Sequence, residues 1–252
     1  MKVTTTKSAD APASSAAQPL AHQVALVTGA SRGIGRGVAL ALARAGADVA
    51  LAARTVPDLD TVASEVQALG RQALVVPADV RDDRSVHVMV ETTLERYGRL
   101  DVLVNNAGLG HFGPVDELTL EQFDEMLGVN LRGPFLCTRA VVPAMKRQGS
   151  GAILNIASVA GLVANPNLAG YNATKFGLMG LSEACMLELR HFGIKVSTIC
   201  PGSTATDFGG GRDAADRLTV EDVAHAVLAV LTAGPQVLIS QLHLRPLHPP
   251  RR

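Results

Sequence analysis

The sequence predicts an α/β protein built on one doubly wound parallel sheet of about seven strands, with helices on both faces. Three observations support this prediction: short apolar and β-branched runs recur along the chain, helix-length segments separate most of them, and glycines end the first three of these segments. Near-continuous apolar strands that alternate with helices are typical of parallel sheets, because right-handed crossovers place helices on both faces.

Seven short runs are predicted to form the strands, at residues 24–28, 48–53, 72–77, 101–105, 152–157, 195–200 and 236–240. Between the first four strands we expect helices at residues 34–45, 59–69 and 83–97, ended by Gly46, Gly70 and Gly98. Glycine is the usual residue at such helix ends. A last helix is expected after Thr219, because Thr219 and Asp222 resemble a capping box, although Asp replaces the usual Glu.

The length of 252 residues and the 47% hydrophobic content are enough to close one substantial core. We expect a single domain at residues 22–244. Residues 1–21 are rich in Ala, Ser, Thr and Pro without a signal-peptide block, which predicts a disordered leader. Residues 245–252 form a tail rich in Pro and Arg, which is typical of a solvated segment.

Charge and cysteine content disfavour several classes of function. The 23 basic residues balance the 23 acidic ones, so no field of one sign favours nucleic acid or an anionic membrane. No run reaches the roughly 18 apolar residues of a membrane span. Cys137, Cys185 and Cys200 lie scattered in apolar stretches, which predicts reduced, buried side chains, no metal and a cytoplasmic location.

A glycine-rich turn follows the first predicted strand, with the sequence TGASRGIG at residues 28–35. Gly29 permits a sharp turn, Gly33 lets the backbone approach a pyrophosphate, and Gly35 lets the following helix pack closely on the sheet. The amides at the start of that helix then face an anion. A glycine-rich loop without a ligand is the alternative for this motif taken alone, because short glycine patterns recur by chance.

The Thr-Gly-x-x-x-Gly-Ile-Gly form of this turn resembles the short-chain dehydrogenase/reductase family, whose other motifs follow in order. Their joint occurrence over residues 22–244 is far more specific than any one motif. The resemblance implies a Rossmann-type fold and a function similar to that of NADP-dependent 3-oxoacyl reductases. The other motifs are Asn105-Asn106-Ala107-Gly108 after the fourth strand, Asn130 in the next helix, Ser158 ending the fifth strand, Tyr171-x-x-x-Lys175 opening a helix, and Pro201-Gly202 ending the sixth strand.

The end of the second strand favours NADP(H) over NAD(H). An acidic residue there would accept the ribose hydroxyls and repel a 2′-phosphate, but the sequence carries Arg54 instead. Arg32 can approach the same phosphate. The resemblance assigns Asp79 and Val80 to the adenine, with a helix N-cap as the alternative role for Asp79. The full expected cofactor set is Gly29, Ser31, Arg32, Gly33, Ile34, Gly35, Arg54, Asp79, Val80, Asn106, Ala107, Gly108, Tyr171, Lys175, Pro201, Gly202 and Thr204.

Carbonyl reduction by hydride develops negative charge on oxygen, which an acid must neutralise. Tyr171 and Lys175 are four residues apart and therefore neighbours on a helix. A cation about 4 Å away contributes around 4 kcal/mol at an effective dielectric of about 20, enough to lower a tyrosine pKa of about 10 by at most roughly three. The resemblance implies that Tyr171 is the acid/base, that Lys175 lowers its pKa and holds the ribose, that Ser158 bonds the substrate oxygen, and that Asn130 connects Lys175 to water.

The substrate is left open by the sequence, beyond a small carbonyl or alcohol compound. Its pocket is expected at residues 109–112, 159–168 and 203–212, which are mostly apolar or small. Residues 207–212 resemble a short lid, and His111 is interpreted as a surface residue. The ending after the last strand lacks the glycines usual in 3-oxoacyl reductases, which weakens a fatty-acid role.

Two alternative functions, a non-catalytic regulator and an epimerase or lyase, are also considered, together with the oligomeric state. A regulator that binds NADP(H) without catalysis is disfavoured by the Ser-Tyr-Lys set, whereas an epimerase or lyase of the same family could retain it. The helices at residues 120–145 and 171–191 are apolar on more than one side, and the family commonly packs them across two-fold axes. We therefore expect a homodimer or homotetramer.

Overall fold

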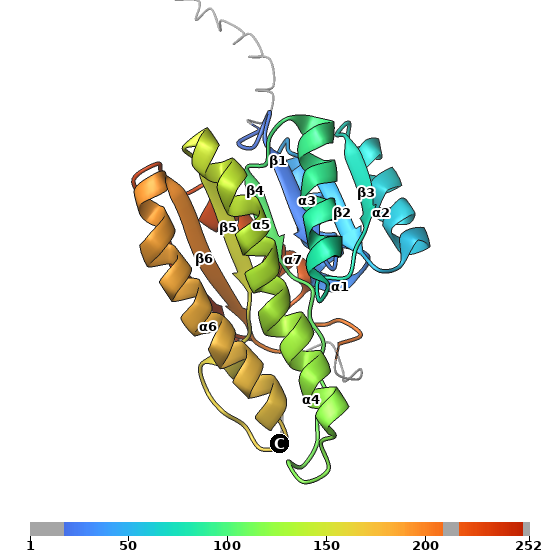
Figure 1. The fold of residues 1–252 in the computed structure, drawn as a ribbon, viewed down its shortest axis with the longest axis vertical. Helices are drawn as coiled ribbons and strands as arrows, with labels where there is room; N and C mark the ends of the chain where they lie inside the picture. The colour runs from blue at the N-terminus through green and yellow to red at the C-terminus, as the bar shows by residue number, and fades with distance from the viewer. Residues whose placement is uncertain (1–17, 209–216, 249–252) are drawn as a thin grey trace, which may run out of the picture.

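The computed structural model describes residues 18–208 and 217–248, which form one seven-stranded sheet with helices on both faces (Figure 1). All neighbouring strands pair in parallel, in the order β3-β2-β1-β4-β5-β6-β7. The predicted doubly wound sheet is therefore confirmed. The strands are β1 Val24–Thr28, β2 Asp48–Ala53, β3 Ala73–Pro77, β4 Val102–Asn105, β5 Gly151–Ile156, β6 Ile194–Pro201 and β7 Gln241–Leu244.

Helices α3, α5 and α6 cover one face of the sheet, in front of the strands in Figure 1, and α1, α2 and α7 cover the other. Residues of each strand alternate between these two layers. In β1, Val24 and Leu26 pack with α3 and α5, whereas Ala25 and Val27 pack with α1, α2 and α7. The helices are α1 Gly33–Arg44, α2 Val56–Ala68, α3 Asp83–Tyr97, α4 Leu120–Leu127, α5 Gly133–Gln148, α6 Ala169–Leu189 and α7 Val220–Leu231.

The predicted helix ends are present in the structure. Gly46, Gly70 and Gly98 have φ angles of 104°, 76° and 73° after α1, α2 and α3, a conformation that favours glycine. At the start of α7, Thr219 and Asp222 form both bonds of a capping box. The carboxylate of Asp222 therefore replaces the usual Glu without loss of the motif.

The last strand was misplaced by the sequence analysis, because the apolar run at residues 236–240 is not a strand. A turn precedes it, with the Val237 amide donating to the Gly234 carbonyl, and Ile239 packs against the core beside α7. Strand pairing with β6 starts only at Gln241. The alternation in Gln241-Leu-His-Leu244, exposed then half-buried, is the pattern of an edge strand.

The order of the strands reverses between β1 and β4, since the chain runs outward through β2 and β3 and then returns to β4. In such sheets ligands bind at the carboxyl ends of the strands, beside this reversal. Among the helices of the described residues, none has the length and apolar character needed to cross a lipid bilayer.

Candidate active site

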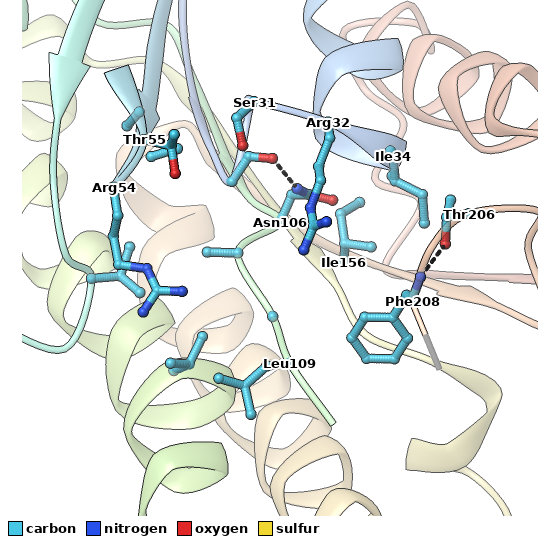
Figure 2. Close-up of a pocket in the computed structure, with 18 of the residues that line it drawn as sticks. Ser31, Arg32, Ile34, Arg54, Thr55, Asn106, Leu109, Ile156, Thr206 and Phe208 are labelled. Atoms are coloured by element: carbon cyan, nitrogen blue, oxygen red, sulfur yellow. Dashed lines mark hydrogen bonds between the residues drawn. The ribbon is translucent and has the colours of Figure 1, made fainter. Parts of the chain in front are cut away.

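A cavity of about 530 Å³ lies at the carboxyl ends of β1, β2, β4 and β5. Figure 2 shows Arg54 near one end of it and Phe208 near the other, with the glycine turn between them. The predicted site residues that line it are Gly29, Ser31, Arg32, Gly33, Ile34, Arg54, Asp79, Val80, Asn106, Ala107, Gly108, Tyr171 and Lys175.

The glycine turn after β1 is held against the turn after β4. Gly29 has a φ of 64°, and a Cβ there would lie 2.9 Å from Ala107 Cα. A Cβ on Gly35 would lie 2.1 Å from the Gly29 oxygen and 2.4 Å from Asn106 Nδ2. The close contact of Gly35 is therefore with the turn itself and with Asn106. Gly33 has a φ of 54°, and a Cβ there would lie in ordinary contact with Thr206 Cγ2, at 3.5 Å.

Hydrogen bonds of Thr28 and Asn106 join these two turns. Asn106 Nδ2 donates to the Thr28 carbonyl at 3.0 Å and to the Gly29 carbonyl at 3.1 Å, and the second of these bonds is the dashed line at Asn106 in Figure 2. Thr28 Oγ1 accepts from the Asn106 and Ala107 amides at 3.0 and 3.1 Å. The side chains thus fix the backbone that a dinucleotide phosphate would approach.

The far end of the cavity is lined by Arg54 and Asp79, and Arg81 lies beside Asp79. The Arg81 guanidinium bonds the Asp79 carboxylate, with an Nη2 to Oδ2 distance of 2.6 Å, and thereby lowers the Asp79 pKa. The charge of Arg54 lowers it further. Asp79 does not cap α3, since Asp82 accepts the bond from the Arg84 amide. The N-cap alternative for Asp79 is therefore wrong.

Tyr171 and Lys175 lie together near the start of α6, with Lys175 Nζ 5.6 Å from the centre of the Tyr171 ring. Both side chains are buried. Burial raises the pKa of Tyr171 to about 12, which hydrogen bonding by the Ser158 side chain only partly offsets, and burial lowers the pKa of Lys175 to about 8. The expected lowering of the Tyr171 pKa by Lys175 is not met, because desolvation dominates the Tyr171 pKa and Lys175 is not among the causes of its shift.

Ser158 and Asn130 hold the backbone around this pair. Ser158 lies two residues after the end of β5, rather than ending the strand as expected, and its hydroxyl accepts from the Ala160 amide at 3.1 Å. Asn130 lies in a short π-helical turn, Gly128–Arg132, between α4 and α5. Its amide group bonds both backbone groups of Leu109, at 2.8 and 2.9 Å, and donates to Thr174 Oγ1. Lys175 Nζ donates to the Ile156 carbonyl at 3.1 Å rather than to Asn130.

The segment after β6 differs from the sequence expectation. Pro201 ends the strand, the Gly202 amide bonds the Leu244 carbonyl, and Thr204 bonds back to Gly202, so these three do not line the cavity. Thr206, Asp207 and Phe208, which belong to the expected substrate segment 203–212, do line it. Most of the proposed lid, residues 209–212, lies outside the described residues. Gly35, Asn130 and Ser158 are also absent from the cavity wall.

Several lining residues were not identified from the sequence. Most come directly after strands, so the rule that ligands bind at carboxyl ends of strands could have found them. Leu109, Thr206, Asp207 and Phe208 fall in the segments expected to form the substrate pocket. The lining residues outside those segments are Ala52, Ala53, Thr55, Asp58, Ala78, Val129, Ile156 and Ala157.

Residues 23–218 match the sequence model of the short chain dehydrogenase family. The chain belongs to this family. It is a short-chain oxidoreductase, whose reaction interconverts CH–OH and C=O groups. The chain is 44% identical over 189 residues to a 3-oxoacyl-[acyl-carrier-protein] reductase of Synechocystis sp., covering 75% of this chain and 76% of that one.

Two solved structures of the same family superpose on most of this chain. An alcohol dehydrogenase from the archaeon Thermococcus sibiricus, complexed with 5-hydroxy-NADP, gives a TM-score of 0.86 at 35% identity and covers 91% of this chain and 99% of its own. A 3-ketoacyl-(acyl-carrier-protein) reductase from Brucella melitensis, complexed with NADH, gives a TM-score of 0.82 at 33% identity. The match covers 90% of this chain and 98% of that one.

Proposed function

We propose that this short-chain oxidoreductase uses NADP(H) to interconvert a carbonyl compound and a secondary alcohol, with Tyr171 as acid/base. The observation that carries the proposal is one cavity that joins the glycine turn and Arg54 to Tyr171 and Lys175. NADPH, when bound, supplies the hydride, and NADP⁺ accepts it in the reverse direction.

The residues of the turn fit a dinucleotide phosphate. Helix α1 begins without a side-chain cap, and its first turn holds no acidic residue. Its first amides therefore lack a capping partner and suit an anion, which the helix dipole further favours. No Cβ covers Gly29 or Gly33, so a pyrophosphate can approach the backbone.

The chemical step uses the buried pair on α6. Tyr171 gives its proton to the substrate oxygen as negative charge develops there. Lys175 remains mostly charged at neutral pH, because its pKa stays near 8. The bond of Lys175 to the Ile156 carbonyl holds that charge beside the Tyr171 ring. Ser158 bonds the Tyr171 side chain and is placed to share the same substrate oxygen.

The direct test follows NADPH absorbance with a panel of ketones, and NADP⁺ reduction with the matching alcohols. Turnover that requires both cofactor and ketone supports the proposal. Cofactor binding without turnover of any ketone or alcohol would indicate a regulator that binds NADP(H) without catalysis. Isomerised products without a net change in NADPH concentration would indicate an epimerase.

A preference for NADPH over NADH is expected, since Arg54 stands where an acidic residue would favour NADH. Charged hydrogen bonds contribute about 1.5–3 kcal/mol, so Arg54→Asp should weaken NADPH binding by roughly ten- to a hundredfold. NADH affinity should hold or rise, because Asp can accept bonds from the ribose hydroxyls, and the balance should shift toward NADH. Arg147→Asp, an equal charge change at the exposed end of α5, serves as control. Equal affinities of the unaltered protein for both cofactors, in a fluorescence titration, would contradict the preference.

A homo-oligomer is expected from the outer stripe of α6. Phe176 is 45% exposed and Leu187 47%, and the exposed positions between them include Gly180 and Ala184. Phe135 on α5 is also 45% exposed. Helical surfaces that face water are normally polar, so this stripe suits a second copy of the chain. Sedimentation velocity at micromolar concentration should give a dimer or tetramer, and a single monomer species would refute the assembly.

A further inference from the structure

Three aromatic rings meet at the chemical end of the cavity, where Tyr171 and Phe208 line the wall and Phe112 packs against both of them. The chain has two tyrosines, six phenylalanines and no tryptophan, yet Phe112, Tyr171 and Phe208 come together from three separate segments. The ring centres are 5.6 Å apart for Phe112 and Tyr171, 6.1 Å for Phe112 and Phe208, and 5.9 Å for Tyr171 and Phe208. We call these three residues the aromatic cluster.

The two phenylalanines are the solvent-exposed members of the aromatic cluster. Phe112 and Phe208 are each 44% exposed, whereas Tyr171 is only 8% exposed. A buried proton donor thus lies beneath two apolar rings that still present free surface. Aromatic rings prefer edge-to-face or offset contact with another flat ring, so this surface suits a flat apolar group.

Phe112 is fixed by its chain neighbours on both sides. His111 Nε2 lies 3.0 Å from Glu125 Oε2, and the Gly113 amide donates to the Asn167 carbonyl at 2.9 Å. The ring also lies over Gly110, where a Cβ would be only 2.4 Å from Phe112 Cζ. This gives His111 a positioning role, in place of the surface role interpreted from the sequence. A ring held in this way loses little entropy when it packs against a substrate.

Phe208 connects the aromatic cluster to the cofactor side of the cavity. Its amide donates to Thr206 Oγ1 at 3.3 Å, as Figure 2 shows, and Thr206 lies beside Gly33. The nearby charges are already partnered: Glu125 with His111 and Arg81, and Asp207 with Arg32. Among the described residues, the cations that line the cavity near the aromatic cluster are Arg32, which pairs with Asp207, and Lys175, which bonds the Ile156 carbonyl. Both already have partners, which favours an uncharged substrate.

We propose that Phe112 and Phe208 determine substrate specificity, and that the preferred substrate is an uncharged ketone or aldehyde with a flat aryl group next to the carbonyl. This inference rests on the proposed carbonyl reduction. The aryl ring packs against both phenylalanines while the carbonyl oxygen lies within reach of Tyr171.

The test compares acetophenone with cyclohexyl methyl ketone, which has a similar size but no flat ring. We expect Phe112→Ala and Phe208→Ala each to lower the ratio of kcat/KM for the aryl over the cyclohexyl ketone by about two- to tenfold, the strength of an aromatic pair. Phe112→Leu keeps apolar bulk and should lower the ratio while preserving turnover of cyclohexyl methyl ketone. Phe192→Ala, also at a 45% exposed phenylalanine but at the opposite end of α6, should leave the ratio unchanged.

A second readout measures binding without turnover. The fluorine NMR line of para-fluoroacetophenone should broaden with the NADP⁺-loaded protein, and the broadening should be lost in the Phe112→Ala/Phe208→Ala double variant. Unchanged ratios and unchanged broadening in folded variants would overturn the specificity role while carbonyl reduction stands. Absence of NADPH oxidation with either ketone and with the wider panel would instead refute the proposed function.

Discussion

Replacing Tyr171 by Phe is expected to lower kcat about a hundred- to ten-thousandfold or more, the usual contribution of general acid catalysis, while NADPH affinity stays nearly unchanged. The substitution removes one hydroxyl from a buried ring and leaves the ring contacts with Phe112 and Phe208 in place. The glycine turn and Arg54 are not altered. Binding and turnover should therefore separate.

Steady-state kinetics on an accepted ketone, beside an NADPH fluorescence titration, measures this separation. A thermal melt checks the fold, since the lost hydroxyl is hydrogen-bonded with Ser158. A folded Tyr171→Phe protein that binds NADPH and turns over near the normal rate would mean that another group supplies the proton.

Lys175→Met completes the same experiment, because it should reduce both turnover and cofactor affinity.

The stability of the unaltered protein is expected to depend on pH through Lys175. The folded pKa of Lys175 is near 8 and the ordinary value is 10.5, so the charged amine destabilises the fold below pH 8. Between pH 8 and 10 the unfolded chain binds more protons than the folded one, and the unfolding free energy rises with pH. The Met variant should lack this rise. Above pH 10 the raised pKa of Tyr171 acts in the opposite direction.

Local patterns in the sequence were sufficient to predict the sheet and the glycine turn. The strands β1 and β2 fall where their apolar runs lie, and the glycines after the first three helices adopt the expected positive φ. The alternation of strands and helices leaves few topologies, because parallel crossovers are right-handed. The motifs after β1, β2 and β4 then meet at one edge of the sheet.

What the sequence analysis missed depends on packing between distant segments. The Tyr171 pKa follows from how completely Met126, Ala160 and other residues outside α6 bury the ring, which the four-residue spacing to Lys175 does not reveal. The π-helical turn that carries Asn130 is set by its bonds to Leu109, a residue from another segment. The aromatic cluster likewise joins three segments, and its members have no common spacing in the chain.

Gly35→Ala is expected to be the most damaging single-methyl change in the cofactor site. The new Cβ would lie 2.1 Å from the Gly29 oxygen, which belongs to the backbone and cannot rotate away. Relief requires α1 to move from the turn and the Asn106 side chain to leave its bonds with Thr28 and Gly29. Overpacking typically costs about 1–3 kcal/mol and sometimes more, and the contact with fixed backbone places this change at or above the upper value. Stability and NADPH affinity should therefore fall together.

Gly234→Ala provides the control for this prediction. Gly234 lies in the loop after α7 without a positive φ, and a Cβ there would meet only Val237 Cγ2, at an ordinary contact of 3.8 Å. Alanine at such a position reduces the entropy of the unfolded chain, so this variant should be as stable as the original protein or slightly more so. Urea unfolding and NADPH titration of both variants test the prediction. If Gly35→Ala unfolds at the same urea concentration as Gly234→Ala and binds NADPH equally well, the close contact between α1 and the glycine turn is not what shapes the phosphate site.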